Sequence, residues 1–240
     1  MSESLDRPID VPQLTAEEIL ARVLHRDGLM LVIDKPAGLP VHRGPKGGPN
    51  LEASFDALRF GLPRPPVLAH RLDKDTSGCL VLGRHRKATA SLGLLFKHGK
   101  ISKTYWAIVE GGPAADEGTI DIPLGRLNAE RGWWQKVDPE GQQAITNWKV
   151  MGRGDGLTWL ALEPVTGRTH QLRVHSSAQG WPIFGDNIYG NGPRFGEPRL
   201  HLHSREIGIP ISKNKEPVRG VAPAPEHMRE RMRACGWNGQ

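Results

Sequence analysis

The chain has 240 residues, with 32 Lys and Arg against 26 Asp and Glu and a formal net charge of +6 at pH 7. Two cysteines, Cys79 and Cys235, are too few for a disulfide framework, and no CxxC pair indicates structural zinc. The N-terminus lacks the pattern of a signal peptide, and no apolar run approaches the ~18 residues of a membrane span. We therefore expect a soluble, cytoplasmic protein with no membrane partner, whose basic balance permits a polyanionic one.

Local patterns predict a short N-terminal tail followed by a helix. Thr15 and Glu18 form a capping box ahead of an apolar helical spacing that is expected to end near 27–28. The later expected elements, in chain order, are a strand at 29–33, a helix at 51–60, a strand at 79–82, a helix at 88–96, strands at 103–110, 118–122, 144–150 and 158–163, a helix capped by Thr169 and ending at 178, strands at 200–203 and 207–211, and a helix at 225–234. Strands outnumber helices and often follow one another directly, which predicts a mixed, largely antiparallel α+β domain.

Several common catalytic motifs are missing from the sequence. It contains no GxxxxGK[ST], GxGxxG, GxSxG or HExxH, which disfavours nucleotide hydrolysis, dinucleotide redox chemistry and serine-hydrolase chemistry. His170, His201 and His203 could contribute to a metal site, but no acidic or thiolate ligand stands at a suitable local spacing. We expect hydrogen-bonded or nucleic-acid-facing histidines and no metal, with a metal-dependent hydrolase as the weaker alternative.

The segment HRLDKDTSG at 70–78 is the richest in reactive side chains. A polar turn would account for Asp75 and the residues after it, but it leaves His70, Arg71 and Asp73 unexplained. Leu72 is expected to anchor inward while its neighbours line a surface. A carboxylate held beside an arginine stays ionised at neutral pH and suits nucleophilic or general-base work. Asp73 is therefore a candidate functional residue.

A second polar segment, PVTGRTHQLRVH at 164–175, combines a turn with a helix start. Gly167 and Thr169 mark the turn into a helix N-terminus, which is a favourable place for an anion. His170 and Arg173 stand three residues apart on one helix face. Two interpretations stay open: a solvated basic face, or an Arg173 that supplies the countercharge of Asp73.

Five segments taken together resemble the RluA-like family of RNA pseudouridine synthases over about 28–204. They are DGLMLVIDKPAGLPVH (27–42), HRLDKDTSGCLVLGR (70–84), KTYWAIVEG (103–111), VTGRTHQLRVHSSAQGWPIFGDNIYG (165–190) and RLHLHS (199–204). The resemblance implies one catalytic domain at 28–240, after a tail and short helix at 1–27, built on a long, bent, mainly antiparallel sheet flanked by helices and loops. It also implies isomerisation of uridine in RNA to pseudouridine without metal, cofactor or energy source.

The resemblance also implies roles for single residues. Asp73 corresponds to the family's essential aspartate, and Arg71 to the residue that enters the RNA stack when the uridine leaves it. Tyr105 is expected to stack on the target base, Leu202 to pack against the base's other side, and Arg173 to pair with Asp73. The carboxylate could attack C1′, attack C6 or remove the C2′ proton, and the sequence does not choose among these steps.

The chain departs from many relatives at its N-terminus. About 27 residues precede the similar region, which is too few for the small RNA-binding domain that many relatives carry. RNA recognition is therefore expected of the catalytic domain, through the basic segments 84–87, 97–103 and 229–233, each of which could instead be a solvated face. We expect a monomer that acts on tRNA or a compact rRNA hairpin. A catalytically inactive RNA-binding relative is the alternative, disfavoured because Asp73, Tyr105 and Arg173 are all present.

Overall fold

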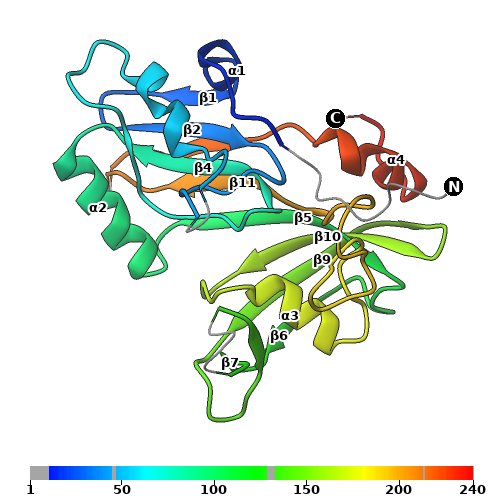
Figure 1. The fold of residues 1–240 in the computed structure, drawn as a ribbon. Coiled ribbons are helices and arrows are strands. Elements are labelled where there is room, and N and C mark those ends of the chain that lie inside the picture. The colour runs from blue at the N-terminus through cyan, green and yellow to red at the C-terminus, as the bar shows by residue number, and fades with distance from the viewer. Residues whose placement is uncertain (1–10, 45–46, 129–132, 213, 240) are drawn as a thin grey trace, which may run out of the picture. The chain divides into compact units, whose positions relative to one another are not determined.

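The structure is a computed structural model that describes residues 11–44, 47–128, 133–212 and 214–239. The described residues form two compact units. We call 11–103 with 204–223 the first unit, and 104–203 with 224–239 the second unit. Each unit is built on antiparallel strands with a few helices, as Figure 1 shows.

The sheet of the first unit places strands from both ends of the chain side by side. Its hydrogen-bonded order is β1-β2-β4-β11, with β3 on β4 and β12 on β11. The pairs β1–β2, β2–β4, β3–β4 and β11–β12 are all antiparallel. The strands are β1 (Val23–Arg26), β2 (Met30–Lys35), β3 (Val67–Leu68), β4 (Ser77–Gly83), β11 (Leu202–Ile209) and β12 (Val218–Val221), and the first two residues of β11 belong to the second unit.

The helices of the first unit are α1 (Ala16–Leu20), the 3₁₀ helix η1 (Glu52–Leu58) and α2 (Arg86–Lys97). The capping box of α1 is confirmed. The expected end of this helix near 27–28 is wrong, because the chain after Leu20 turns into β1 and pairs with β2, where Val23 faces Ile33. The helix expected at 51–60 forms as a 3₁₀ helix, and the one expected at 88–96 is confirmed as α2.

The core of the first unit lies where α2 covers the sheet. β2 and β4 are buried along nearly their whole length. Met30, Val32 and Val81 pack with Leu92 of α2 in one apolar cluster. A strand covered on both faces reads as a continuous apolar run, and this is the pattern that marked 29–33 and 79–82 in the sequence.

The strands of the second unit follow the order β5-β10-β9-β6, and each pair is antiparallel. A separate hairpin joins β7 to β8. Two helices, α3 (Gln171–Ala178) and α4 (Glu226–Ala234), complete the unit. The strands are β5 (Ser102–Glu110), β6 (Glu117–Asp121), β7 (Leu124–Arg126), β8 (Gln135–Val137), β9 (Ile145–Gly154) and β10 (Leu157–Pro164).

Alternate residues of β10 enter two different cores. Leu160 and Leu162 point to the face that also holds Leu172 of α3. Trp159 points to the opposite face and packs with Met228 of α4. The two faces of this sheet are therefore covered by different helices, so that polar residues of α3 can be held against a rigid support.

The expected α+β class, with a long, mainly antiparallel sheet and few helices, is confirmed. The strands expected at 200–203 and 207–211 are wrong as two separate elements, because the chain runs without a break as β11. The short strands β1, β3, β7, β8 and β12 escaped prediction. In the described part of the chain, no helix combines the length and the apolar character needed to cross a membrane.

Candidate active site

Asp73 lies in a tight turn that leads into β4 in the first unit. The backbone N–H of Thr76 donates to the Asp73 carbonyl at 3.2 Å and closes the turn. Leu72 is buried, whereas Arg71 before it is exposed and Asp73 after it is half-buried. The prediction that Leu72 anchors inward while its neighbours line a surface is therefore confirmed.

A buried lysine, Lys35, donates hydrogen bonds to the backbone of this turn. Lys35 has no exposed surface, and its Nζ donates to the carbonyls of Pro36 at 2.8 Å, Lys74 at 2.8 Å and Thr76 at 2.9 Å. Lys35 reaches the turn because β2 and β4 pair with Lys35 opposite Gly78. Three charge-assisted hydrogen bonds restrict the backbone on both sides of Asp75, and hence the position from which the Asp73 side chain projects.

The charge of Lys35 is tuned by its surroundings. Burial lowers the pKa of the Lys35 ammonium to about 7, and the carboxylates of Asp75 and Asp73 act against the shift. Three carbonyl acceptors call for three N–H donors, which only the charged form of lysine has. The buried Lys35 ammonium therefore interacts electrostatically with both carboxylates of the turn, Asp75 and Asp73.

The junction between the turn and β4 requires glycine. Gly78 has φ +103°, and a Cβ at this position would lie 2.2 Å from the carbonyl oxygen of Ser204 in β11. The atoms that this Cβ would meet belong to the Ser204 backbone, which cannot move aside as the end of a flexible side chain could. At the other end of the segment, the His70 ring stacks on Phe96 of α2 with centroids 4.1 Å apart, and its Nε2 accepts from the Val81 amide at 3.0 Å. Burial lowers the pKa of His70 to about 3, so this histidine is neutral at physiological pH.

Tyr105 and Leu202 lie together in the second unit. Tyr105 is on β5, opposite Leu162 of β10, and its partly buried ring packs against the apolar cluster that includes Leu202. Leu202 begins β11 and is buried. An aromatic ring and an aliphatic side chain of one cluster are thus the two expected walls for a base.

Arg173 makes a buried bidentate ion pair with Asp186. Its Nε donates to Oδ2 at 2.8 Å and its Nη2 to Oδ1 at 2.7 Å, and the two side chains are 3% and 1% exposed. The amides of Ile188 and Tyr189 donate to the same carboxylate at 2.9 and 3.0 Å. Burial raises the pKa of Asp186, but the hydrogen bond and charge of Arg173 outweigh it and hold the pKa below its ordinary value. Arg173 therefore stays charged and fixed in orientation.

The interpretation of α3 as a solvated basic face is wrong. Gln171 is buried and bridges Thr166, Thr146 and the Ile145 carbonyl. His175 is buried as well, with its Nδ1 2.9 Å from the Thr146 hydroxyl and burial lowering its pKa. Gln171, Arg173 and His175 therefore face the protein interior, where hydrogen bonds set their positions.

The start of α3 also differs from the prediction. The N-cap is His170, in the left-handed region at φ 53°, and not Thr169. His170 takes this conformation because its Nδ1 lies 2.7 Å from the Tyr189 hydroxyl, which in turn accepts from the Gln135 amide at 2.9 Å. A tertiary contact thus decides where this helix begins.

The histidines provide no metal site in the described part of the chain, where no group of three or more His, Cys, Asp and Glu side chains could hold an ion. His201 is fully buried, its Nδ1 lies 2.7 Å from the Arg199 carbonyl, and burial lowers its pKa to about 3. The expectation of hydrogen-bonded histidines is confirmed for His201, His170 and His175. The described residues therefore leave the metal-hydrolase alternative without a ligand set.

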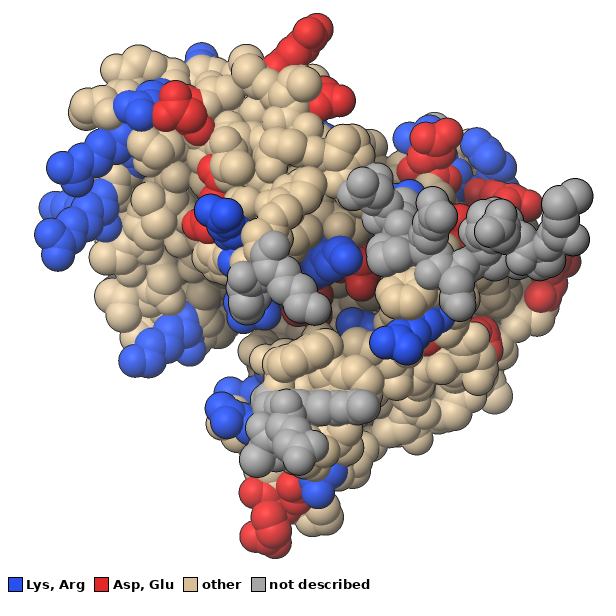
Figure 2. Space-filling view, in the orientation of Figure 1, with Lys and Arg blue, Asp and Glu red and all other residues tan. Residues whose placement is uncertain are grey.

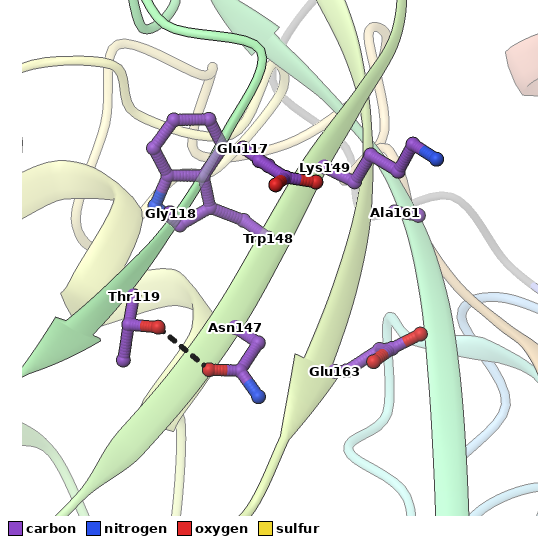
Figure 3. A pocket seen from close by; sticks show the side chains of 8 residues that line it. All are labelled: Glu117, Gly118, Thr119, Asn147, Trp148, Lys149, Ala161 and Glu163. Carbon is purple, nitrogen blue, oxygen red and sulfur yellow. Dashed lines mark hydrogen bonds between the residues drawn. The ribbon is translucent and has the colours of Figure 1, made fainter.

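A cavity of about 300 Å³ opens on the β6, β9 and β10 strands of the second unit (Figure 3). Its lining combines Lys149 with two acids, Glu117 and Glu163, and Thr119 donates to Asn147 at 2.8 Å. The residues predicted for the active site do not line it. One cation between two carboxylates is unsuited to a phosphate, so we assign this cavity no part in the chemistry.

Two residues that position the site escaped prediction, Lys35 and Asp186. Both lie in segments that carry the family resemblance, and a signal for Lys35 was present. It follows the apolar run 29–33 with the same strand parity as Leu31 and Ile33, so a strand pattern extended by two residues would have buried it. Asp186 had no such local signal, because its partner is reached through the loop after α3.

Comparison with known proteins identifies relatives along most of the chain. The model of a family described as RNA pseudouridylate synthase matches residues 29–178. An uncharacterized RNA pseudouridine synthase of Zymomonas mobilis is 43% identical over 207 residues, covering 85% of this chain and 94% of the relative. A ribosomal large subunit pseudouridine synthase D of Xanthomonas campestris is 35% identical over 239 residues, covering 91% of this chain and 70% of the relative.

Solved structures agree with the sequence comparison. The human RNA pseudouridylate synthase domain containing 4 superposes with a TM-score of 0.75 at 28% identity, covering 91% of this chain and 95% of that one. The human RNA pseudouridylate synthase domain containing 1 superposes with a TM-score of 0.72 at 28% identity, covering 90% of this chain and 87% of that one. Similarity in sequence and fold therefore extends over both units.

Proposed function

The chain belongs to the RNA pseudouridylate synthase family, whose members isomerise uridine in RNA, and from this premise we propose that it modifies selected uridines of structured rRNA or tRNA with Asp73 as the catalytic residue. In the reaction the N1–C1′ bond breaks, the uracil turns, and C5 bonds to C1′. The hydrogen on C5 leaves as a proton and N1 gains one, so atoms and charge balance without an external reagent. No cofactor is needed for this step.

The observation that carries the proposal is the turn that holds Asp73. Lys35 anchors the carbonyls of Lys74 and Thr76, and the Thr76 amide closes the turn on the Asp73 carbonyl. A half-buried carboxylate on a backbone restrained in this way costs little reorganisation when it reacts. A turn that served only to connect two strands would need no fully buried ammonium beneath it.

The target base must leave its stack before the glycosidic bond can be reached, at a cost of a few kcal/mol. We assign to the exposed Arg71 the place that the base vacates, because a planar guanidinium can stack on RNA bases. Tyr105 stacks on the extruded uracil, an interaction of about 1–3 kcal/mol per base. Leu202 belongs to the same apolar cluster as Tyr105 and supports the other side of the base. Two apolar walls let the uracil turn without escaping.

Arg173 completes the proposed site as the partner of Asp73. A guanidinium has five N–H donors. Asp186 accepts from Nε and Nη2, so Arg173 has the donors to serve a second carboxylate. In this arrangement Asp186 sets the orientation of the guanidinium that we assign to Asp73 as its partner.

We also propose a target RNA, a location and an oligomeric state for the enzyme. A relative named as a ribosomal large subunit synthase favours rRNA as the target. We place the enzyme in the cytoplasm and expect it to act as a monomer, although two relatives from rice and frog carry mitochondrial names.

The test uses isosteric changes at two neighbouring carboxylates. RNA transcribed with tritium on uracil C5 releases tritium to water when the new C–C bond forms. We expect Asp73→Asn to bind RNA as well as the unmodified protein and to lose at least about a thousandfold in tritium release. Asp75→Asn, in the same turn, is expected to stay within about tenfold. Substantial activity in Asp73→Asn would overturn the assignment.

The three possible roles of Asp73 can be separated by isotopic labelling. Deuterium on C2′ of the target nucleotide slows the reaction if the carboxylate removes the C2′ proton in a rate-limiting step. No slowing is expected if it attacks C1′ or C6. Trapping the enzyme on 5-fluorouridine RNA and locating the linkage by mass spectrometry distinguishes those two: a bond to C6 stays with the base, and one to C1′ with the ribose.

A further inference from the structure

The positive charge of the chain is concentrated in one segment of the first unit. Residues 84–103 contain six of the 32 Lys and Arg residues and none of the 26 Asp and Glu residues. The rest of the chain has 26 of each, so this segment alone accounts for the net charge of +6. It comprises α2, the turn after it, and the first residues of β5.

The structure separates cations of this segment that support the fold from those that face outward. Arg84 donates to the Asp27 carbonyl at 2.6 Å and to the Arg59 and Phe60 carbonyls, so it fastens the loops around it. Lys103 is partly buried, and burial lowers its pKa. Four others are exposed and, within the described structure, form no ion pair with an acid: Arg86, Lys87, Lys97 and Lys100.

The other expected basic segment, 229–233, is engaged within the second unit. Arg229 donates to the Ala224 carbonyl at 2.9 Å. Arg231 lies over the Phe184 ring at 4.5 Å and Arg233 over the Trp237 ring at 5.8 Å. These three side chains have structural partners, whereas none is recorded among the described residues for the exposed cations Arg86, Lys87, Lys97 and Lys100.

The placement of charge on α2 is unfavourable for the helix itself. A first turn favours acids, because unsatisfied N–H groups give it partial positive charge. Arg86 and Lys87 occupy that turn, and no acid accompanies them. Each cation there costs a few tenths of a kcal/mol to about 1 kcal/mol. Helix stability therefore does not account for these two residues, whereas an anionic partner would.

The outward face of α2 is also shaped for close approach. Ala88 and Leu92 face the core, while Ala90, Ser91 and Leu94 between the two cationic ends are exposed. The small Ala90 and Ser91 lie beside the apolar Leu94 in the middle, and the cations stand at both ends, about 15 Å apart along the axis, which suits an extended polyanion. In Figure 2 blue Lys and Arg side chains gather where Figure 1 draws α2.

The last turn of α2 touches the segment that bears the catalytic aspartate. The Phe96 ring stacks on His70, which directly precedes the exposed Arg71. A polyanion lying along α2 is therefore led toward Arg71 and Asp73. We propose that the face formed by Arg86, Lys87, Lys97 and Lys100 binds the phosphate backbone of the RNA that carries the target uridine. This inference rests on the proposed function and adds the surface that supplies sequence-independent affinity.

The test replaces the four cations by glutamine, which has a high helix propensity. Binding of a short fluorescein-labelled RNA hairpin is measured by anisotropy over a series of salt concentrations. Each phosphate contact contributes about 0.7–0.9 to the slope of log Kd against log salt. We expect the slope to fall by about 3 and Kd to rise at least tenfold. Circular dichroism and thermal melting confirm that the variant is folded.

A matched variant removes the same charge elsewhere and is expected to lower the slope by less than 1. It carries glutamine at the exposed positions Arg64, Lys136, Lys149 and Lys215. A conservative variant with arginine at Lys87, Lys97 and Lys100 is expected to keep its RNA affinity. Equal slopes for the two glutamine variants would overturn the proposal. So would an α2 variant that binds RNA normally but loses binding to phosphatidylserine vesicles, which would assign the face to a membrane.

Tritium release separates this proposal from the isomerase assignment. If the unmodified enzyme releases tritium and the α2 variant recovers the full rate at high enzyme concentration and low salt, the face contributes affinity and not chemistry. An unmodified enzyme without activity on total cellular RNA would contradict the proposed function, while the salt slopes would still report on the face. A rate that stays low at saturating enzyme would contradict a role limited to backbone binding.

Discussion

Replacing Asp186 by asparagine tests how Arg173 is held. The carboxylate accepts two hydrogen bonds from the guanidinium, at 2.8 and 2.7 Å, and two from backbone amides. An asparagine side chain has the same shape but only one acceptor oxygen. In either orientation its NH₂ group meets an N–H donor, so at least one bond is lost and a nearly buried guanidinium lacks its countercharge.

The expected loss in the free energy of unfolding follows from these contacts. A hydrogen bond to a charged group contributes about 1.5–3 kcal/mol, and breaking a buried ion pair from one side costs about 3–5 kcal/mol in total. We expect Asp186→Asn to lower the free energy of unfolding by that 3–5 kcal/mol. With a urea slope of roughly 2–3 kcal/mol/M the unfolding midpoint falls by about 1–2.5 M. The rate constant for tritium release should fall as well, because Arg173 loses its fixed orientation.

An exposed ion pair and the pH dependence of stability serve as controls for Asp186→Asn. Asp116 pairs with Arg153 at 2.9 Å, but the two side chains are 85% and 43% exposed, so Asp116→Asn should cost no more than about 1 kcal/mol. The Asp186 contribution is present above pH 3.8 and disappears as the pH falls through its lower folded pKa, so the two proteins should converge in stability in acid. A loss below about 1 kcal/mol at neutral pH would show that the buried pair does not hold α3 in place.

Three further substitutions address the rest of the site. Lys35→Met leaves three carbonyls without their donor. Although the change also removes a buried charge, we expect the free energy of unfolding in urea to fall by about 2–4 kcal/mol and the turnover rate to fall as well. Unchanged stability and turnover would contradict the anchoring role. Gly78→Ala forces a Cβ against the Ser204 carbonyl and should cost more than about 3 kcal/mol, whereas Gly93→Ala, with open space in helix α2, should stabilise by up to about 1 kcal/mol in thermal melting; equal effects would refute the steric argument. Burial lowers the pKa of His201 to about 3, so below pH 6.5 the unfolded chain binds a proton that the folded chain does not. His201→Gln should therefore flatten the fall of stability below pH 6.5, by about 0.7 kcal/mol per pH unit at pH 6.5 and nearly 1.4 at pH 5, and an unchanged slope would show that His201 titrates normally.

Local sequence determined the elements whose signals lie within a few residues of one another. The capping box of α1, the helix at 86–97 and the strand at 102–110 follow from spacing and propensity alone. So does the inward position of Leu72, since alternation across a short extended segment needs no distant partner. These features depend on backbone geometry that a single segment carries with it.

Tertiary structure decided which polar groups work together. Lys35 meets the Thr76 carbonyl 41 positions away because β2 pairs with β4, and Arg173 meets Asp186 across the loop after α3. The first helix ends early for the same kind of reason, since the chain after Leu20 pairs as β1 with β2.

The net charge of +6 is also determined partly by the sequence and partly by the tertiary structure. Its location in 84–103 can be counted in the sequence, but Arg84 and Lys87 look alike there. Only the fold brings the Asp27 carbonyl to Arg84 and leaves Lys87 exposed on α2. Composition determines how much charge the chain carries, and burial and hydrogen bonding, which depend on segments distant in sequence, decide which of that charge is available to a partner.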